Sequence, residues 1–157
     1  MLPEGQLSNY WRSLNAYIET NYTLTAKSLM DEELDTEPLS EWVEFIWASQ
    51  VPHSFIRHAD NVNMGNLMDA SVGAIICVKP LASSLVGRIF TIRDVVVDLL
   101  RRPLIVVKDW AGSKAEIGTL QGEGLLSDVN LRRVDDINRW SLMFKFRYQE
   151  KFERVRP

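Results

Sequence analysis

The side chains that could do chemistry in this sequence are few and poorly spaced for it. Metal sites are built from histidine, cysteine and carboxylate ligands at characteristic spacings. His53 and His58 lie five residues apart outside an H-E-x-x-H frame, and Asp60 and Asp69 follow them. The single cysteine, Cys77, excludes an intramolecular disulfide and a cysteine-rich zinc site. We expect exposed loop histidines and no bound metal.

Nucleophilic and phosphate chemistry are equally hard to place. A catalytic thiol needs a positioned base, but Cys77 lies within the apolar run IICV, where a buried and inert thiol is the usual outcome. The acids at 135 and 136 are adjacent, so we expect their carboxylates to diverge and stay solvated. Residues 118–124 (GTLQGEG) match neither phosphate-binding glycine pattern. The sequence therefore predicts no enzyme and no cofactor.

The C-terminal region mixes basic and aromatic residues, as many nucleic-acid-binding surfaces do. If this region is a strand, its side chains alternate between two faces. One face then carries Trp140, Leu142, Phe144, Phe146 and Tyr148, and the other carries Ser141, Met143, Lys145 and Arg147. Base stacking needs aromatics and cations on the same exposed face. We therefore expect a buried aromatic face and no specific nucleic-acid binding.

The composition describes one globular domain over residues 1–157. The chain is 46% hydrophobic and 25% charged, and its length is near the commonest domain size. No apolar run approaches the ~20 residues of a membrane helix, and we see no secretory signal. With one cysteine, the composition fits folding in a reducing cytoplasm.

The predicted elements give an α+β fold. Apolar stripes predict helices over residues 7–22, with Asn9 and Ser13 toward solvent, and over residues 83–102, with Phe90 in the buried stripe. Two helices and mostly neighbouring strands imply a largely antiparallel, twisted sheet with the helices on one face. The predicted strands are residues 41–48, 67–79, 104–107, 114–120 and 140–148, with 125–134 either a strand or an irregular connection.

Three segments lie between these elements. Residues 31–41 are acid-rich and contain a proline, which predicts mainly loop. Residues 50–67 contain a proline, a glycine and both histidines, which predicts a long exposed loop or a hairpin arm. The glycines of residues 118–124 predict a flexible or tightly turned segment.

Charge is distributed unevenly along the chain. Residues 1–78 carry three Lys or Arg against 11 acidic residues, a net charge of −8. Residues 79–157 carry 15 Lys or Arg against 10 acidic residues, a net charge of +5. Such asymmetry suggests a charged partner, either nucleic acid or a second copy of the chain, although both sets of charges are also compatible with simple solvation.

The order of these segments resembles the bacteriophage tail terminators, the tail-completion proteins of the head–tail neck. The resemblance covers nearly the whole chain as a pattern of elements and lengths. It is carried by the segments SNYWRSLNAYI, EWVEFIWAS, SVGAIICVKP, IFTIRDVVVDLLRRP, LIVVKDWAG and RWSLMFKFRYQEKF.

The resemblance implies a structural protein of the virion, made in the host cytoplasm, without catalytic residues or cofactor. Such proteins form a hexameric ring that caps the tail tube, ends its polymerisation and meets the head-closure or connector protein. In contractile phages the ring also contacts the sheath, and DNA passes through it. The alternative from another class is a small cytoplasmic module that binds nucleic acid or a regulatory partner.

A ring needs two unlike faces on each subunit, and the charge asymmetry could supply them. We expect an acidic set, Asp31, Glu32, Glu33, Glu41 and Glu44, to face a basic set, Arg132, Arg133, Lys145 and Arg147, on a neighbour. Candidate aromatic anchors are Trp42, Trp47 and Trp110, and the expected tube-facing loop carries His53, Phe55, Arg57 and His58.

Charge reversal at Arg132 and Arg133 is predicted to weaken assembly, because charge matching fixes register and speeds encounter between subunits. Light scattering measures the effect, and an unchanged oligomer size would count against the predicted contact.

Overall fold

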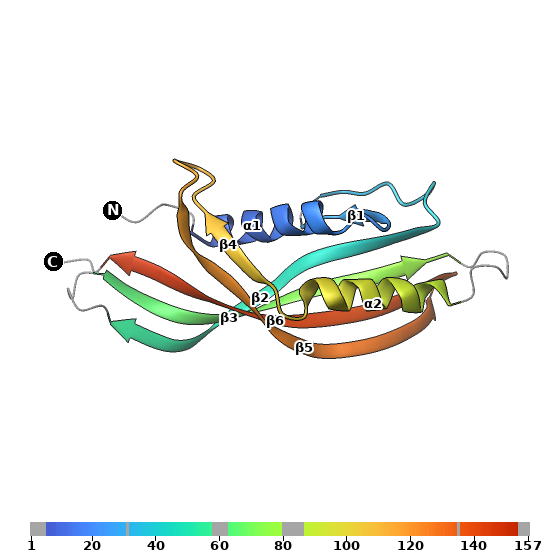
Figure 1. Ribbon diagram of the computed structural model, residues 1–157. Helices are drawn as coiled ribbons and strands as arrows, with labels where there is room; N and C mark the ends of the chain where they lie inside the picture. Colours follow the sequence, from blue (N-terminus) through green and yellow to red (C-terminus); the bar gives the residue numbers. More distant parts are fainter. Residues whose placement is uncertain (1–5, 31, 58–62, 80–86, 135, 154–157) are drawn as a thin grey trace.

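A computed structural model describes residues 6–30, 32–57, 63–79, 87–134 and 136–153. In these ranges the chain forms two helices and a six-stranded sheet (Figure 1). None of the described helices is long and apolar enough to cross a membrane. The elements are α1 (Gln6–Asn21), β1 (Ala26–Ser28), β2 (Glu41–Arg57), β3 (Asn63–Val78), α2 (Arg88–Leu100), β4 (Leu104–Lys108), β5 (Glu116–Val134) and β6 (Ile137–Glu153).

The sheet has the strand order β1-β2-β3-β6-β5-β4. Its neighbours are antiparallel except for the parallel pair β1 and β2. The centre is the pairing of β3 with β6, which keeps one register from Asn63 opposite Glu153 to Val78 opposite Asn138. The sheet is therefore organised around two strands that are far apart in the sequence.

One face of the sheet and both helices enclose the core. The predicted alternation in β6 is confirmed, because Leu142, Phe144, Phe146 and Tyr148 are buried while the residues between them lie on the other face. The helices add to the same cluster: Tyr10, Leu14 and Ile18 from α1, and Ile92, Val96 and Leu99 from α2. The predicted α+β fold, with its helices on one face of a largely antiparallel sheet, is confirmed.

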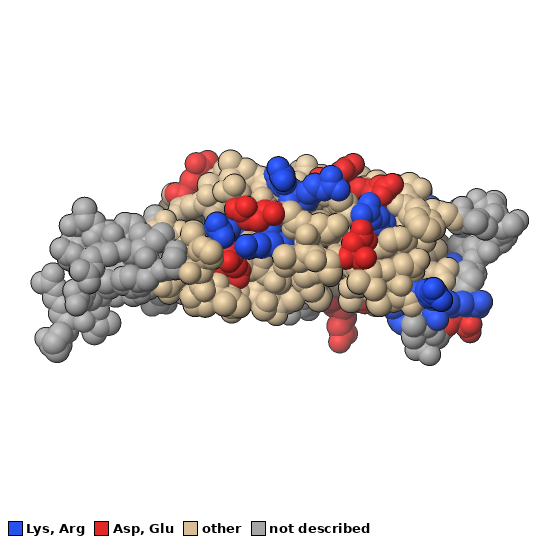
Figure 2. Space-filling view, turned by 90° about the horizontal axis from the view of Figure 1, so that it is seen from below, with Lys and Arg blue, Asp and Glu red and all other residues tan. Residues whose placement is uncertain are grey.

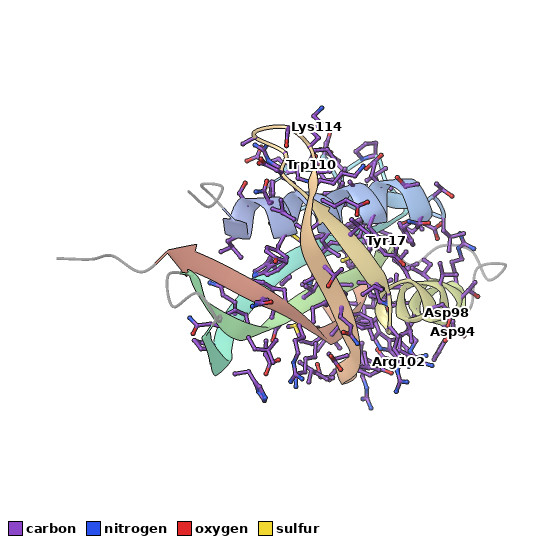
Figure 3. All side chains as sticks on the ribbon, turned by 60° about the vertical axis from the view of Figure 1, so that its left-hand side comes forward. Tyr17, Asp94, Asp98, Arg102, Trp110 and Lys114 are labelled. Atoms are coloured by element: carbon purple, nitrogen blue, oxygen red, sulfur yellow. The ribbon has the colours of Figure 1, made fainter. Side chains whose placement is uncertain are left out.

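α1 also lies along the edge of β4. Asn9 and Ser13, predicted to face solvent, are buried instead. Asn9 Oδ1 accepts from the backbone N–H of Trp110 (2.9 Å), and Ser13 Oγ accepts from the backbone N–H of Lys108 (3.2 Å). The Tyr17 hydroxyl (Figure 3) donates a hydrogen bond to the carbonyl of Leu99 in α2 (2.8 Å). α1 thereby binds the end of β4 and the chain just after it.

Residues 50–57 and 63–67 pair as antiparallel strands within a three-stranded arm, as one of the two predictions for this segment expected. β2 continues to Arg57, and β3 begins at Asn63. We define the arm as residues 51–57 of β2, 63–69 of β3 and 147–153 of β6, which pair with one another along its length. The arm extends past both helices at the left of Figure 1.

Two strands differ from the sequence-based expectation. β1 was not predicted, because a three-residue parallel strand is too short to show a pattern. β5 is one strand of 19 residues, although its glycine-containing segment was predicted to be flexible or turned. β-bulges absorb the irregularity, and Gly124 adopts a φ of 110° that glycine tolerates best.

The second helix also departs from its predicted stripe. Residues 83–86, where it was predicted to begin, lie outside the described residues, and α2 starts at Arg88. Phe90 was predicted to be buried but is 54% exposed. Its ring packs edge-on against Trp140, with ring centroids 5.1 Å apart. The apolar stripe was therefore drawn too wide on this side.

Gly122→Ala is predicted to destabilise the fold by about 1–3 kcal/mol. An added Cβ would lie 2.9 Å from the Cα of Arg102 and from the backbone N of Pro103, and these main-chain atoms cannot move aside cheaply. Urea unfolding measures the loss. Gln121→Ala, at the exposed neighbouring position, is the control, and equal stability of the two variants would contradict the close packing.

Candidate contact surfaces

The outer edge of β2 is open beyond β1. β1 pairs with β2 at Trp42, Val43 and Glu44. The chain then turns away, with the N–H of Glu32 bonded to the carbonyl of Leu29 (2.9 Å). Past Glu44, β2 has β3 as its one partner among the described strands. A strand edge of this kind is a template for another chain.

A hollow of about 670 Å³ lies along this open edge, between β2 and the first turns of α1. Apart from Ser8 and Arg12 its lining is apolar or aromatic: Leu7, Trp11, Met30, Ile46 and Trp47. We call this hollow, with residues 45–51 of β2, the β2 groove. It combines an apolar floor with unpaired strand edge, the two features that bind extended segments.

Acidic residues follow the β2 groove along the chain. Beyond Met30, which lines the groove, Glu32 and Glu33 are exposed, and Glu32 accepts a hydrogen bond from Ser28 of β1 through its carbonyl (2.9 Å). Asp35 and Glu37 are exposed further along, near the start of β2, where Lys79 Nζ binds the carbonyl of Glu37 (2.8 Å). Of the predicted acidic set, Asp31 lies outside the described residues. Glu41 is half-buried and binds the guanidinium of Arg88 through two hydrogen bonds (2.9 and 2.8 Å).

The distal half of β5, residues 123–134, forms a second open edge, beyond Gly122, whose N–H is bonded to the carbonyl of Pro103 (2.8 Å). β4 pairs with β5 no further than Gln121, so beyond it β6 is its one strand partner in the described chain. Three large apolar side chains are exposed here: Leu126 (55%), Val129 (47%) and Leu131 (44%). Arg132 and Arg133 follow, both exposed.

The second predicted basic group, Lys145 and Arg147, lies on the outer sheet face and is paired within the chain. Asp69, opposite Arg147 on β3, accepts from Arg147 Nε (3.0 Å) and lies 3.7 Å from Lys145 Nζ. His53 Nδ1 approaches the same carboxylate at 3.2 Å. Positive and negative side chains are likewise intermixed on the side away from α1 (Figure 2).

The pKa of Asp69 is shifted by the basic side chains around it. Partial burial raises the pKa, while the hydrogen bond from Arg147 and the positive charges of Arg147 and Lys145 lower it. The net result is a pKa below the ordinary value of 3.8. Asp69 therefore stays ionised at neutral pH. It forms ion pairs with Lys145 and Arg147, which were predicted to face a neighbouring subunit.

Cys77 lies in β3 and is buried. Burial raises the pKa of its thiol to about 11, with the charge of Glu44 acting in the same direction. A protonated thiol is a poor nucleophile at neutral pH. In the described ranges no three metal-binding side chains come together, and His58 and Asp60 lie outside those ranges.

The predicted tube-facing residues lie on the arm. His53 is an exposed residue of β2, and Phe55 and Arg57 follow it in the same strand. The register shift between Pro52 and Ser54 interrupts the pleat beside His53. The position of His58 lies outside the described residues.

The three predicted aromatic anchors have different positions. Trp42 is buried, and Trp110 is bound to α1 through its indole Nε1 and Ser13 Oγ (2.9 Å). Trp47 lines the β2 groove. Sequence reasoning missed the groove itself, including Arg12. A possible signal was the run ASQVPH (residues 48–53), which lacks the apolar alternation of a covered strand.

Neither a model of a known protein family nor a curated protein matches this sequence, so the function has to be inferred from these surfaces.

Asp69→Asn is predicted to lower the free energy of unfolding at neutral pH by about 1 kcal/mol, because it leaves Arg147 and Lys145 without their counter-charge. The folded-state pKa of Asp69 is lowered, so its contribution is complete above the ordinary value of 3.8 and is lost as the pH falls through the folded value. The two proteins should therefore converge in acid.

Urea unfolding at neutral and acidic pH tests this. Asp98→Asn, on the exposed side of α2 (Figure 3), is the matched control and should show no such convergence. Equal stability of the Asp69→Asn variant and the original chain at neutral pH would rule out a stabilising cluster.

Proposed function

We propose that this chain is a structural subunit of a bacteriophage neck, a tail terminator. Six copies form a ring that caps the tail tube, ends its polymerisation and joins it to the head-closure or connector protein. In a contractile tail the ring also meets the sheath, and DNA passes through its centre. The role is structural, within the virion, after synthesis in the bacterial cytoplasm.

The observation that carries this proposal is the pair of unlike open edges on one sheet. The β2 groove and the distal half of β5 lie on opposite sides of the central β3–β6 pair. A two-fold dimer needs one self-complementary patch, whereas a ring needs two different patches on each subunit. A sheet open on both sides, with different chemistry at each edge, suits head-to-tail assembly.

The arm supports a contact outside the ring. Its three strands extend beyond the helices, so it can reach a neighbouring ring without disturbing the core (Figure 1). His53, Phe55 and Arg57 follow its β2 strand. We infer that the arm meets the tube protein.

The alternative, a nucleic-acid-binding or regulatory module, is less well supported. Nucleic-acid affinity comes mainly from cations that neutralise phosphates. Lys145 and Arg147 already share Asp69, and the aromatic side chains of β6 from Phe144 to Tyr148 lie on the buried face. This side of the sheet therefore lacks the combination that stacks bases.

Leu7→Glu is predicted to prevent ring formation, because a charge would be placed in the apolar β2 groove. Val95→Glu is the matched control on α2: Val95 is 37% exposed and Leu7 is 40% exposed. Mass photometry and electron microscopy, with and without tail tubes assembled from the neighbouring tube gene, measure the ring. Thermal unfolding checks that both variants fold.

Two observations would contradict the terminator assignment: the genes that surround this one, and salt-sensitive binding of DNA. A chain whose gene lies far from portal, sheath and tube genes, and which stays monomeric with tubes, is not a terminator. If it also binds DNA with an affinity that falls steeply with salt, the nucleic-acid module is the better assignment.

A further inference from the structure

We propose that the distal half of β5 in one copy docks into the β2 groove of the next copy. The partner is thus a second copy of this chain, and the inference deepens the proposed ring by naming the two surfaces that meet. It rests on the proposed function in assuming that copies assemble head to tail.

Apolar complementarity is the first reason. Leu126, Val129 and Leu131 are each about half exposed and lie within six residues of β5. Single exposed hydrophobic residues are normal on a protein surface, whereas a group of them indicates a contact site. The β2 groove offers Leu7, Trp11 and Trp47 around a hollow of about 670 Å³, a volume within the usual range of ligand-sized clefts. Docking removes both surfaces from water at once.

Charge complementarity is the second reason. Glu32 and Glu33 are exposed just beyond Met30 of the groove, whose lining also includes Arg12, and Arg132 and Arg133 are exposed at the end of β5. The pair that Arg133 makes with Asp136 (2.8 Å) is largely exposed, so it competes weakly. The apolar segment therefore matches the apolar side of the groove, and its basic end matches the two acids beyond Met30.

Backbone pairing is the third reason. Both surfaces are strand edges without a neighbouring strand among the described residues, and two such edges can continue one sheet across a contact. On β5 the N–H of Arg132 is already bonded to Asn130 Oδ1 (2.9 Å), so the pairing has to lie before it. Irregularities in both strands limit how many residues of β5 and β2 can pair across the contact. Pro52 cannot donate a hydrogen bond from β2, and the bulges of β5 bend its edge. These features fit a short, specific contact and oppose indefinite edge-to-edge stacking.

Cross-linking tests the contact directly. Ala48→Cys places a thiol at the groove edge and Leu131→Cys places one on the distal half of β5, while buried Cys77 stays unreactive. With a short bis-maleimide, a mixture of the two variants should give cross-linked dimer, and each variant alone should not. The matched control mixes the Ala48→Cys variant with an Asp98→Cys variant, whose thiol lies on α2, and should give no cross-linked dimer.

A charge exchange tests specificity. Glu32→Arg with Glu33→Arg in the groove variant should reduce cross-linking about tenfold at low salt. Adding Arg132→Glu and Arg133→Glu to the β5 variant should restore it. The proposed docking is overturned if the mixture does not cross-link or if either variant alone does. It is also overturned if the charge exchange on β5 does not restore the cross-linking that the groove substitutions remove.

The outcomes separate this inference from the function on which it rests. Rings on tail tubes without the Ala48–Leu131 cross-link would leave the terminator role standing and refute the contact. Cross-links without any ring on tubes would keep the contact and refute the terminator role.

Discussion

The pairing of β3 with β6 is the constraint on which the rest of the structure depends. It joins residues 63–78 to residues 138–153 in one register, and each strand supplies alternate residues to the core. A shift by one position would turn Phe144 and Val72 toward the outer face. The same pairing holds the arm together at one end and positions β2 and β5 as flanking strands, so both candidate contact surfaces depend on it.

α1 makes the two sides of the sheet different. Its Tyr10 and Leu14 face the core, while Asn9 and Ser13 accept hydrogen bonds from β4 and the chain just after it. Its first turns, at Leu7, face the β2 groove. One helix therefore binds the end of β4 and helps to line the open edge of β2. Two long surfaces with different chemistry follow from this placement, and a head-to-tail assembly requires such a difference.

The charges divide into those used within the chain and those left for a partner. Asp69 binds Arg147 and approaches Lys145, and Glu41 binds Arg88, so these residues stabilise the subunit itself. The exposed acids beside the groove and the arginines at the end of β5 remain at the surface. Exposed charges steer and align partners more than they bind them. The burial of apolar groups then has to supply most of the affinity.

The sequence by itself determined the elements whose side chains follow a regular period. The stripe of α1, the alternation of β6 and the α+β class were readable because periodicity directly reflects which face is buried. Tertiary structure alone decided what lies opposite each residue. The burial of Asn9 and Ser13, the capture of Lys145 and Arg147 by Asp69, and the groove between α1 and β2 join segments far apart in the chain. Such contacts leave no local pattern, since hydrogen bonds and cavities depend on distances in space and not on spacing along the sequence.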